Sequence, residues 1–223
     1  MSSKVKIKAA EYVTHNVRRF DVEKPPGWAF EPGQATEVSI DKEGWRDEKR
    51  PFTFTSLPEW EDLQFTIKIY PDHGGVTEQL GKLEVGDTLL LEEPWGTIQY
   101  KGPGTFIAGG AGVTPFIAIL RALERDGKLE GHSLLFSNNT ERDIILREEF
   151  DAMDGLATTY VLSAEDEDKP GLVRGLIDKN FLKENISDFG QHFYVCGPDQ
   201  MVNDINKALK ELGAEPDALV FEK

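Results

Sequence analysis

The tetrapeptide Arg50-Pro51-Phe52-Thr53 combines three side chains that together could hold a charged, planar ligand. The guanidinium of Arg50 offers a fork of N–H donors that matches the oxygens of a phosphate. The ring of Phe52 offers a flat face for stacking, and the hydroxyl of Thr53 can donate or accept a hydrogen bond. The same string would also suit an edge strand with a surface arginine, so its role depends on what accompanies it.

A second group, Gly109-Gly110-Ala111-Gly112-Val113-Thr114-Pro115, lies between the apolar run 105–108 and the amphipathic run 116–120. Glycines at such a turn let the backbone approach a pyrophosphate, and the following helix offers unpaired N–H groups and the positive end of its dipole. Pro115 stands where the usual dinucleotide fingerprint has its third glycine, and it suits the first turn of a helix because it has no N–H. In the alternative interpretation, the glycines only tighten a strand-to-helix turn.

A third group, Cys196-Gly197-Pro198, ends the apolar run 192–195 and precedes the helical run 199–212. It should therefore lie at the same carboxyl edge of a parallel sheet as the glycine turn, which is where ligands bind in such folds. The thiol of Cys196 could contact a nicotinamide there. It could equally be a small apolar packing residue.

The first half of the chain has the elements needed to position Arg50–Thr53. Short alternating or β-branched runs, separated by Gly- and Pro-rich turns, predict strands at residues 5–13, 17–22, 34–40, 52–55, 63–70 and 87–91. A short helix is expected at 76–83. This pattern predicts an antiparallel, six-stranded Greek-key β-barrel over residues 1–101.

The second half alternates strands and helices. Strands are predicted at 105–108, 133–136, 158–162, 192–195 and 219–221, and helices at 115–126, 141–153, 176–184 and 199–212. Gly102-Pro103-Gly104 marks the boundary between the halves. Residues 102–223 are therefore expected to form a five-stranded parallel-sheet, Rossmann-like nucleotide-binding domain.

Composition excludes several classes of protein. The 223 residues include 25 basic and 40 acidic residues, and the formal net charge of −15 argues against nucleic-acid binding. One cysteine rules out an internal disulfide and a cysteine-ligated cluster, and the four histidines (His15, His73, His132, His192) lack metal-ligand spacing, so we expect no metal. No apolar stretch reaches the roughly 18 residues of a membrane helix, and we expect a cytoplasmic protein.

Arg50-Pro51-Phe52-Thr53 resembles the Arg-x-Tyr-Ser/Thr signature of the ferredoxin reductase-like flavoproteins, with Phe52 in place of the tyrosine. Gly74-Gly75-Val76-Thr77 resembles the Gly-x-x-Ser/Thr turn of that family, and Pro94-Trp95-Gly96 its Pro-x-Gly element. The glycine turn and Cys196-Gly197-Pro198 follow in the family's order. The resemblance covers almost the whole chain.

The resemblance implies FAD in the barrel, a pyridine dinucleotide on the α/β half, and hydride transfer from the nicotinamide to flavin N5. By analogy Arg50 would pair with the flavin pyrophosphate, Phe52 would pack on the isoalloxazine, and Thr53 would hydrogen-bond N5. Thr53 and Cys196 are the catalytic candidates. The implied cofactor-binding residues are Arg50, Phe52, Thr53, Ile67, Ile69, Tyr70, Gly74, Gly75, Val76, Thr77, Gly110, Gly112, Thr114, Pro115, Asn138, Cys196, Gly197, Pro198, Met201 and Phe221.

The choice of dinucleotide can be argued from the residues after the third strand of the sheet. NADPH-using relatives tend to have Ser-Arg there, whereas Ser163 precedes Ala164-Glu165-Asp166-Glu167-Asp168. These acids would repel a 2′-phosphate, which favours NADH. The run could instead be only a solvated loop, and Arg142 or Arg174 could supply the missing cation.

Because the sequence has one cysteine, we expect no fused iron–sulfur domain, and we expect electrons to leave to a separate soluble carrier such as ferredoxin, flavodoxin or a heme protein. Two alternatives stay open: a reductase of free flavin, and a non-catalytic nucleotide-binding or electron-transfer subunit. A basic patch that docks an acidic carrier is a further hypothesis. Lysines on a strand, however, commonly serve only to keep a protein soluble. The candidate members of this patch are Lys4, Lys6, Lys8, Arg18, Arg19, Arg46 and Lys49.

Overall fold

The computed structural model describes residues 2–96 and 98–215 in full and the backbone of residues 219–221. The contacts of the chain divide it into two compact units. One comprises Met1–Gly96 with Thr114–Ala122, and the other Thr97–Val113 with Leu123–Lys223. Each unit has its own sheet and its own hydrophobic core.

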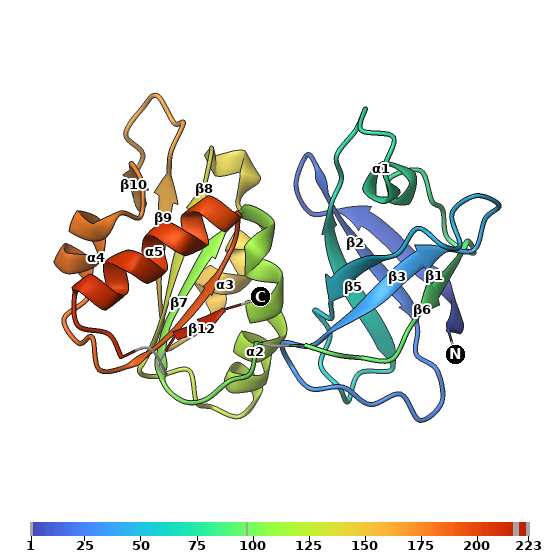
Figure 1. Ribbon diagram of the computed structural model, residues 1–223, viewed down its shortest axis with the longest axis horizontal. Coiled ribbons are helices and arrows are strands. Elements are labelled where there is room, and N and C mark those ends of the chain that lie inside the picture. Colours follow the sequence, from blue (N-terminus) through green and yellow to red (C-terminus); the bar gives the residue numbers. More distant parts are fainter. Residues whose placement is uncertain (1, 97, 216–218, 222–223) are drawn as a thin grey trace. The chain divides into compact units, whose positions relative to one another are not determined.

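In residues 2–96, six strands form one antiparallel sheet (Figure 1). They are β1 (Ser3–Tyr12), β2 (Val17–Glu23), β3 (Ala35–Ile40), β4 (Arg50–Thr53), β5 (Asp62–Lys68) and β6 (Thr88–Leu91). The order β4-β3-β6-β1-β2-β5 is a Greek-key connectivity, and a bridge between Phe54 and Phe65 links its two edges. The sheet therefore nearly closes, and the predicted barrel is confirmed.

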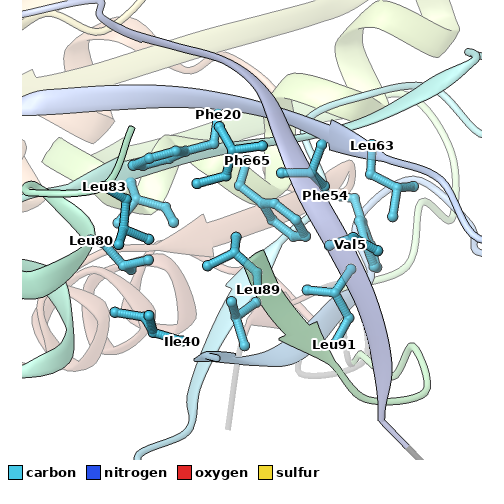
Figure 2. Close-up of a cluster of buried hydrophobic side chains, with 14 of the residues drawn as sticks. Val5, Phe20, Ile40, Phe54, Leu63, Phe65, Leu80, Leu83, Leu89 and Leu91 are labelled. Atoms are coloured by element: carbon cyan, nitrogen blue, oxygen red, sulfur yellow. The ribbon is translucent and has the colours of Figure 1, made fainter. Parts of the chain in front are cut away.

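The barrel closes around a core of large apolar side chains that alternate along its strands. Figure 2 shows Phe20, Phe65 and Leu89 together with Val5 and Leu91 in this core, and all five are at most 1% exposed. Burial of each large side chain contributes about 1.5–3 kcal/mol. Helix α1 (Val76–Leu80) adds Val76 and Leu80 to the same core, which fixes the turn that precedes it.

In the described part of the second unit, six parallel strands form a sheet of order β10-β9-β8-β7-β11-β12. They are β7 (Gly104–Gly109), β8 (His132–Asn138), β9 (Leu156–Leu162), β10 (Leu172–Arg174), β11 (His192–Cys196) and β12 (Leu219–Phe221). The five predicted strands are confirmed, and the three-residue β10 adds a short edge. Its length, between Gly171 and Gly175, is too small for a hydrophobic pattern to reveal it.

The helices of the chain's second half are α2 (Thr114–Arg125), α3 (Arg147–Ala152), α4 (Lys179–Asn185) and α5 (Asp199–Glu211). Leu182 of α4 and Ile205 of α5 pack on one face of the sheet with Leu135 of β8. On the other face, Phe150 of α3 meets Phe136 edge-on, with 6.2 Å between ring centroids. None of the helices in the described residues is long and apolar enough to cross a membrane.

In place of the predicted helix 141–153, the structure has a 3-10 turn followed by the shorter helix α3. Residues Glu141–Asp143 form a 3-10 turn (η2) with a capping box between Thr140 and Asp143. Ile144 and Ile145 are then buried, and Leu146 has a left-handed φ of 53° just before α3. Burial of these apolar side chains interrupts the helix that the 3.6-residue pattern suggested.

The predicted helix 176–184 begins later, at Lys179, because the Asp178 carboxylate accepts a hydrogen bond from Phe181 N at 2.8 Å and caps it. The predicted helix 76–83 ends earlier, at Leu80, before Gly81.

Candidate functional site

The segment that carries Arg50, Phe52 and Thr53 is β4, which pairs with β3. Arg50 is exposed, and its guanidinium donates to the Lys49 carbonyl at 2.6 Å and lies 3.7 Å from Glu48. Phe52 is half-buried against the edge of the barrel core, and Thr53 is also half-buried. The strand thus leaves the Arg50 guanidinium exposed and keeps the Phe52 ring and the Thr53 hydroxyl partly accessible.

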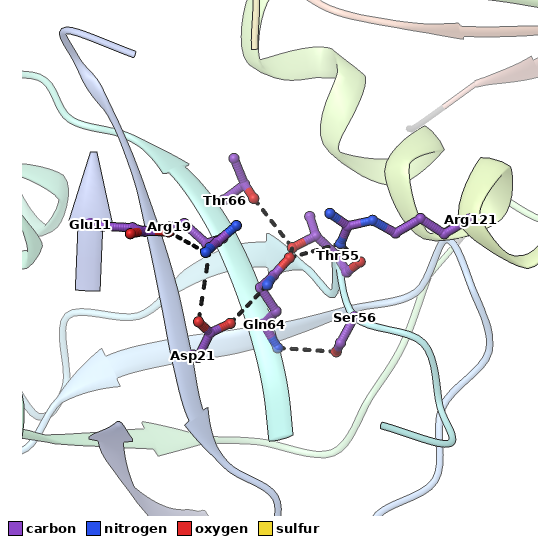
Figure 3. A network of polar contacts seen from close by, with 8 residues as sticks. All are labelled: Glu11, Arg19, Asp21, Thr55, Ser56, Gln64, Thr66 and Arg121. Atoms are coloured by element: carbon purple, nitrogen blue, oxygen red, sulfur yellow. Dashed lines mark hydrogen bonds and ion pairs between the residues drawn. The ribbon is translucent and has the colours of Figure 1, made fainter. Parts of the chain in front are cut away.

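Buried polar contacts fix the chain just beyond β4 (Figure 3). Thr55 N donates to Gln64 O at 2.8 Å, and the Thr55 hydroxyl donates to Gln64 Oε1 at 3.1 Å. Gln64 N in turn donates to Ser56 Oγ at 3.0 Å. Arg121 of α2 also enters this network, with hydrogen bonds to Thr55 O at 2.6 Å and Gln64 Oε1 at 2.8 Å.

The turn at residues 74–77 is open and glycine-dependent. Gly74 has a φ of +63°, which favours glycine, and a Cβ on Gly75 would meet no atom within 4 Å. Gly74 N donates to Glu78 Oε2 at 2.8 Å. Hydrogen bonds to the Glu78 carboxylate, first from Lys82 and then from Gly74, lower its pKa. The turn already holds one anionic oxygen on its backbone, as a phosphate-cradling turn must.

Three further cofactor candidates lie at the end of β5. Ile67 and Ile69 are 2% and 7% exposed and belong to the barrel core. Their side chains serve the core, so any cofactor contact would come from their backbone. Tyr70 is exposed, with His73 edge-on to its ring at 6.0 Å and Lys68 Nζ 5.5 Å from the ring centroid.

In the second unit, β7 and β11 are neighbouring strands, so the glycine turn and Cys196-Gly197-Pro198 lie at one carboxyl edge as expected. A Cβ on Gly112 would lie 2.6 Å from the Cys196 carbonyl carbon and from Gly197 Cα. A Cβ on Gly109 would clash with Met201 Sδ and lie 3.0 Å from Pro198 Cδ. The two turns therefore interlock, and only glycine permits this approach.

The remaining predicted residues lie around these turns. Gly110 and Val113 belong to the 3-10 turn η1 (Gly110–Val113), and Thr114 and Pro115 open α2. Cys196 is 7% exposed, and Met201 on α5 is partly buried. Phe221 lies on β12, where the structure describes only the backbone, so the prediction for its side chain falls outside the described residues.

Asn138 ends β8, the strand beside β7, and is 5% exposed. Both polar atoms of its side-chain amide are buried, and neither has a hydrogen-bond partner within the part of the chain that the structure describes. Such an amide pays the full cost of desolvation, about 1–3 kcal/mol, unless a ligand or water completes it. An orphaned amide at the ligand-binding edge therefore fits a bound dinucleotide.

The acidic loop after β9 is held in an ionic network. Lys169 Nζ lies 2.8 Å from Glu141 Oε2 and 3.1 Å from Glu165 Oε1, and Arg174 lies 3.2 Å from Asp168. Hydrogen bonds from Lys169, and then from Arg147, lower the pKa of Glu141. Lys169 and Arg174 already have acidic partners, so a 2′-phosphate would have to compete for them.

Ion pairs neutralise most of the candidate basic patch. Lys4 and Arg46 share Asp41, at 2.8 and 2.5 Å. Further pairs join Lys8 to Asp62, Lys49 to Glu92 and Arg19 to Glu11. Arg18 is buried and donates to the Gly81 carbonyl at 2.9 Å, closing the end of α1. This surface is therefore close to neutral and does not present a free positive patch.

These residues fit the two expected cofactors. Arg50, Phe52, Thr53 and the 74–77 turn could hold FAD, because the cation is exposed and the turn is open. The glycine turn, Asn138 and Cys196-Gly197-Pro198 could hold a pyridine dinucleotide. Sequence reasoning did not single out Arg121; the only signal in the sequence is a single charge within the otherwise apolar stretch 116–123.

Comparison with known proteins bears on both units. A model of the oxidoreductase FAD-binding domain matches residues 4–100, and a model of the oxidoreductase NAD-binding domain matches residues 106–207. The flavohem-like FAD/NAD-binding domain of nitric oxide dioxygenase from Vibrio cholerae has the same fold, with a TM-score of 0.87 at 23% identity. That similarity covers 98% of this chain and 97% of the other.

Two curated relatives are similar in sequence. The ferredoxin–NAD(P)(+) reductase component of the naphthalene 1,2-dioxygenase system of Pseudomonas putida is 27% identical over 217 residues, which cover 94% of this chain and 65% of the relative. NADH-cytochrome b5 reductase 1 of Aspergillus oryzae is 30% identical over 229 residues, which cover 93% of this chain and 77% of the relative. The chain thus spans 65% of the length of the first relative and 77% of the second.

Proposed function

The chain belongs to the ferredoxin reductase-like family of NAD(P)H-dependent, FAD-binding oxidoreductases, and we propose that it oxidises NADH and passes the electrons to a separate protein carrier of the ferredoxin or flavodoxin type. The observation that carries the proposal is the interlock of Gly112 with Cys196 and Gly197 beside the orphaned Asn138 amide. The same chain carries Arg50, Phe52 and Thr53, the candidate flavin-binding residues, on strand β4 of its barrel.

When bound, FAD would supply the redox chemistry, which is uptake of a hydride with a proton and return of the two electrons one at a time. The barrel residues bind and orient it. Arg50 neutralises the pyrophosphate with its fork of donors, and the exposed part of the Phe52 ring packs on the isoalloxazine. The Thr53 hydroxyl donates a hydrogen bond to N5 or accepts one from it, as the protonation of N5 requires. Phe52 lacks the phenol of the usual tyrosine, so it contributes stacking alone.

The second half of the sequence binds and orients the dinucleotide. The backbone at Gly110 and Gly112 approaches the pyrophosphate, and the first turn of α2 offers N–H groups to it. The Asn138 amide supplies a donor and an acceptor to the ligand. Cys196, at the end of β11, contacts the nicotinamide and excludes water from it. Orientation of this kind supplies much of the rate enhancement in hydride transfer.

The ionic network after β9 supports NADH as the donor. Asp166 and Glu167 are exposed, and the nearby cations Lys169 and Arg174 have carboxylate partners. A 2′-phosphate would meet net negative charge at this loop, whereas a ribose hydroxyl would not. The Aspergillus oryzae relative is named for NADH.

The names of the two relatives support a protein as the electron acceptor, because one is named for ferredoxin and the other for cytochrome b5. The net charge of −15 and the neutralised basic surface predict weak, transient docking of an acidic carrier.

The experiment is to reduce the FAD-loaded protein with NADH anaerobically and mix it, in separate runs, with a ferredoxin, a flavodoxin, cytochrome b5 and free FMN. We expect the ferredoxin or the flavodoxin to be reduced fastest. If free FMN alone is reduced, the protein is a flavin reductase. If cytochrome b5 is reduced fastest, the carrier is a heme protein, and either result contradicts the proposed acceptor.

A further inference from the structure

Arg121 is a charged side chain buried at the barrel. It lies on α2 in the part of that helix that groups with the barrel, and it is 8% exposed. Its guanidinium donates to Thr55 O at 2.6 Å and to Gln64 Oε1 at 2.8 Å, and its Cζ lies 5.1 Å from the centre of the Trp60 ring. Burial of a guanidinium is unfavourable unless its donors are well used, so this placement calls for a specific role.

The first acceptor, the Thr55 carbonyl, lies two residues after Thr53. The Thr55 and Ser56 side chains are fully buried, and the Thr55 hydroxyl also lies 3.2 Å from that of Thr66. Backbone pairing with β5 holds this segment from one side, through Thr55 N and Gln64 O. Arg121 adds a contact from a different element, the helix α2 (Figure 3).

The second acceptor, Gln64 Oε1, has a fixed orientation. Gln64 Nε2 donates to Asp21 Oδ1 at 2.8 Å, so the amide nitrogen faces Asp21 and the amide oxygen faces Arg121. Asp21 lies 3.9 Å from Arg19 Nε, and Arg19 pairs with Glu11 at the surface. These contacts fix the orientation of the Gln64 amide, so that its oxygen points to the Arg121 guanidinium.

We infer that Arg121 is a positioning residue for the flavin. It holds the segment after β4 through the Thr55 carbonyl, and so sets the Thr53 hydroxyl against the reacting edge of the isoalloxazine. Its buried positive charge also favours electron uptake by a flavin bound to this barrel, because charge interactions are strong where water is excluded. This inference rests on the proposed flavin site at β4.

The test compares Arg121→Met, which removes the charge and the donors, with Arg121→Lys, which keeps a charge but loses the fork. Arg125→Met is the matched control, because Arg125 lies one turn further along α2 and its side chain is 45% exposed beside Asp126. For each FAD-loaded protein, the dissociation constant of FAD, the reduction potential against a reference dye, and the limiting rate of flavin reduction by NADH are measured.

In Arg121→Met we expect the limiting rate of flavin reduction to fall at least tenfold, while the NADH concentration at half-maximal rate changes less than threefold. The reduction potential should shift to a more negative value. Arg121→Lys should recover part of the rate, and Arg125→Met should match the unmodified protein. An unchanged rate and potential in Arg121→Met would overturn the inference.

If Arg121→Met does not fold, Arg121→Lys decides the question. A reduced rate at an unchanged melting temperature supports the inference, and an unchanged rate and potential contradict it. If the unmodified protein keeps FAD but NADH does not reduce it, the proposed function fails. The role of Arg121 is then decided separately by the flavin reduction potentials of Arg121→Met and the unmodified protein. A more negative potential in Arg121→Met supports that role, and equal potentials contradict it.

Discussion

Arg50 is the side chain on which FAD retention depends most directly in this account. Its guanidinium is exposed, and the contacts that the described residues show for it are with Lys49 and Glu48. Arg50→Ala should weaken FAD binding by about 1.5–3 kcal/mol, the range for a charge-assisted hydrogen bond, or roughly 10- to 150-fold in dissociation constant. Fluorescence titration with FAD measures this change.

Arg46→Ala is the matched control for Arg50→Ala, because Arg46 is an exposed arginine of the preceding loop that pairs with Asp41. It should leave the dissociation constant of FAD unchanged. Equal FAD affinity in Arg50→Ala and the unmodified protein would remove Arg50 from the site.

Gly112 has no room for a side chain. Gly112→Ala would place a Cβ 2.6 Å from the Cys196 carbonyl carbon, so the backbone of one turn must move. We expect a loss of about 1–3 kcal/mol in the free energy of unfolding, typical of overpacking, together with weaker NADH binding. Urea unfolding and NADH titration of the FAD-loaded protein measure the two effects.

Gly190→Ala provides the comparison for Gly112→Ala, since its Cβ would meet only the flexible side chain of Asp188, at 3.1 Å. If both variants unfold at the same urea concentration and bind NADH equally, the interlock of the two turns is not what requires glycine.

Among single residues, the sequence predicts the groups whose chemistry is visible in their type. Arg50, Phe52, Thr53 and Asn138 could be named from the resemblance alone. Their hydrogen-bond partners could not be predicted. Within the described residues the Asn138 amide has none, and this depends on which groups the fold places around it. Arg121 was missed for the same reason: its acceptors, Thr55 and Gln64, are remote in sequence.

At the element scale, the loop that joins β9 to β10 bears on dinucleotide choice. Ala164 is exposed and follows Ser163, and no arginine occupies its position. Ala164→Arg should raise the efficiency with NADPH relative to NADH by about tenfold, the equivalent of one charge-assisted contact to a phosphate. Steady-state kinetics with both dinucleotides measures the ratio.

Ala152→Arg, on the exposed side of α3, adds the same charge elsewhere in the unit and should not move the ratio. A ratio that stays constant in Ala164→Arg, or that moves equally in both variants, would mean that the 2′ position of the ribose lies away from this loop.

The elements predicted from sequence were those with a long, clear period. All six barrel strands and five of the parallel strands could be predicted, to within a few residues at each end. The errors came from tertiary context. Buried Ile144 and Ile145 split one predicted helix, and β10 is defined by pairing with β9 more than by any pattern of its own.

For the whole molecule, surface carboxylates contribute to acid stability, each by a small amount because the pairs are exposed. Hydrogen bonds from Lys4, Lys49 and Lys169 lower the pKa values of Asp41, Glu92 and Glu141 respectively below the ordinary 3.8 for Asp and 4.5 for Glu. A carboxylate whose pKa is lower in the folded state stabilises the fold above its unfolded pKa, and that stability disappears as the pH falls through the folded pKa.

The melting temperature should therefore be insensitive to these groups above about pH 5 and should fall progressively below about pH 4.5. Calorimetry across a series of acidic buffers measures it, and high salt should reduce the drop because it screens exposed pairs. A melting temperature that rises on acidification through this range would contradict the assignment of the pairs.

The central claim is that the barrel holds FAD in a state that NADH can reduce. The most direct measurement is an anaerobic titration of the FAD-loaded protein with NADH, followed by the visible absorbance of the flavin. We expect complete bleaching at one NADH per FAD, with NADPH far less effective at equal concentration. A protein that stays yellow in excess NADH, yet bleaches with a chemical reductant, would contradict it.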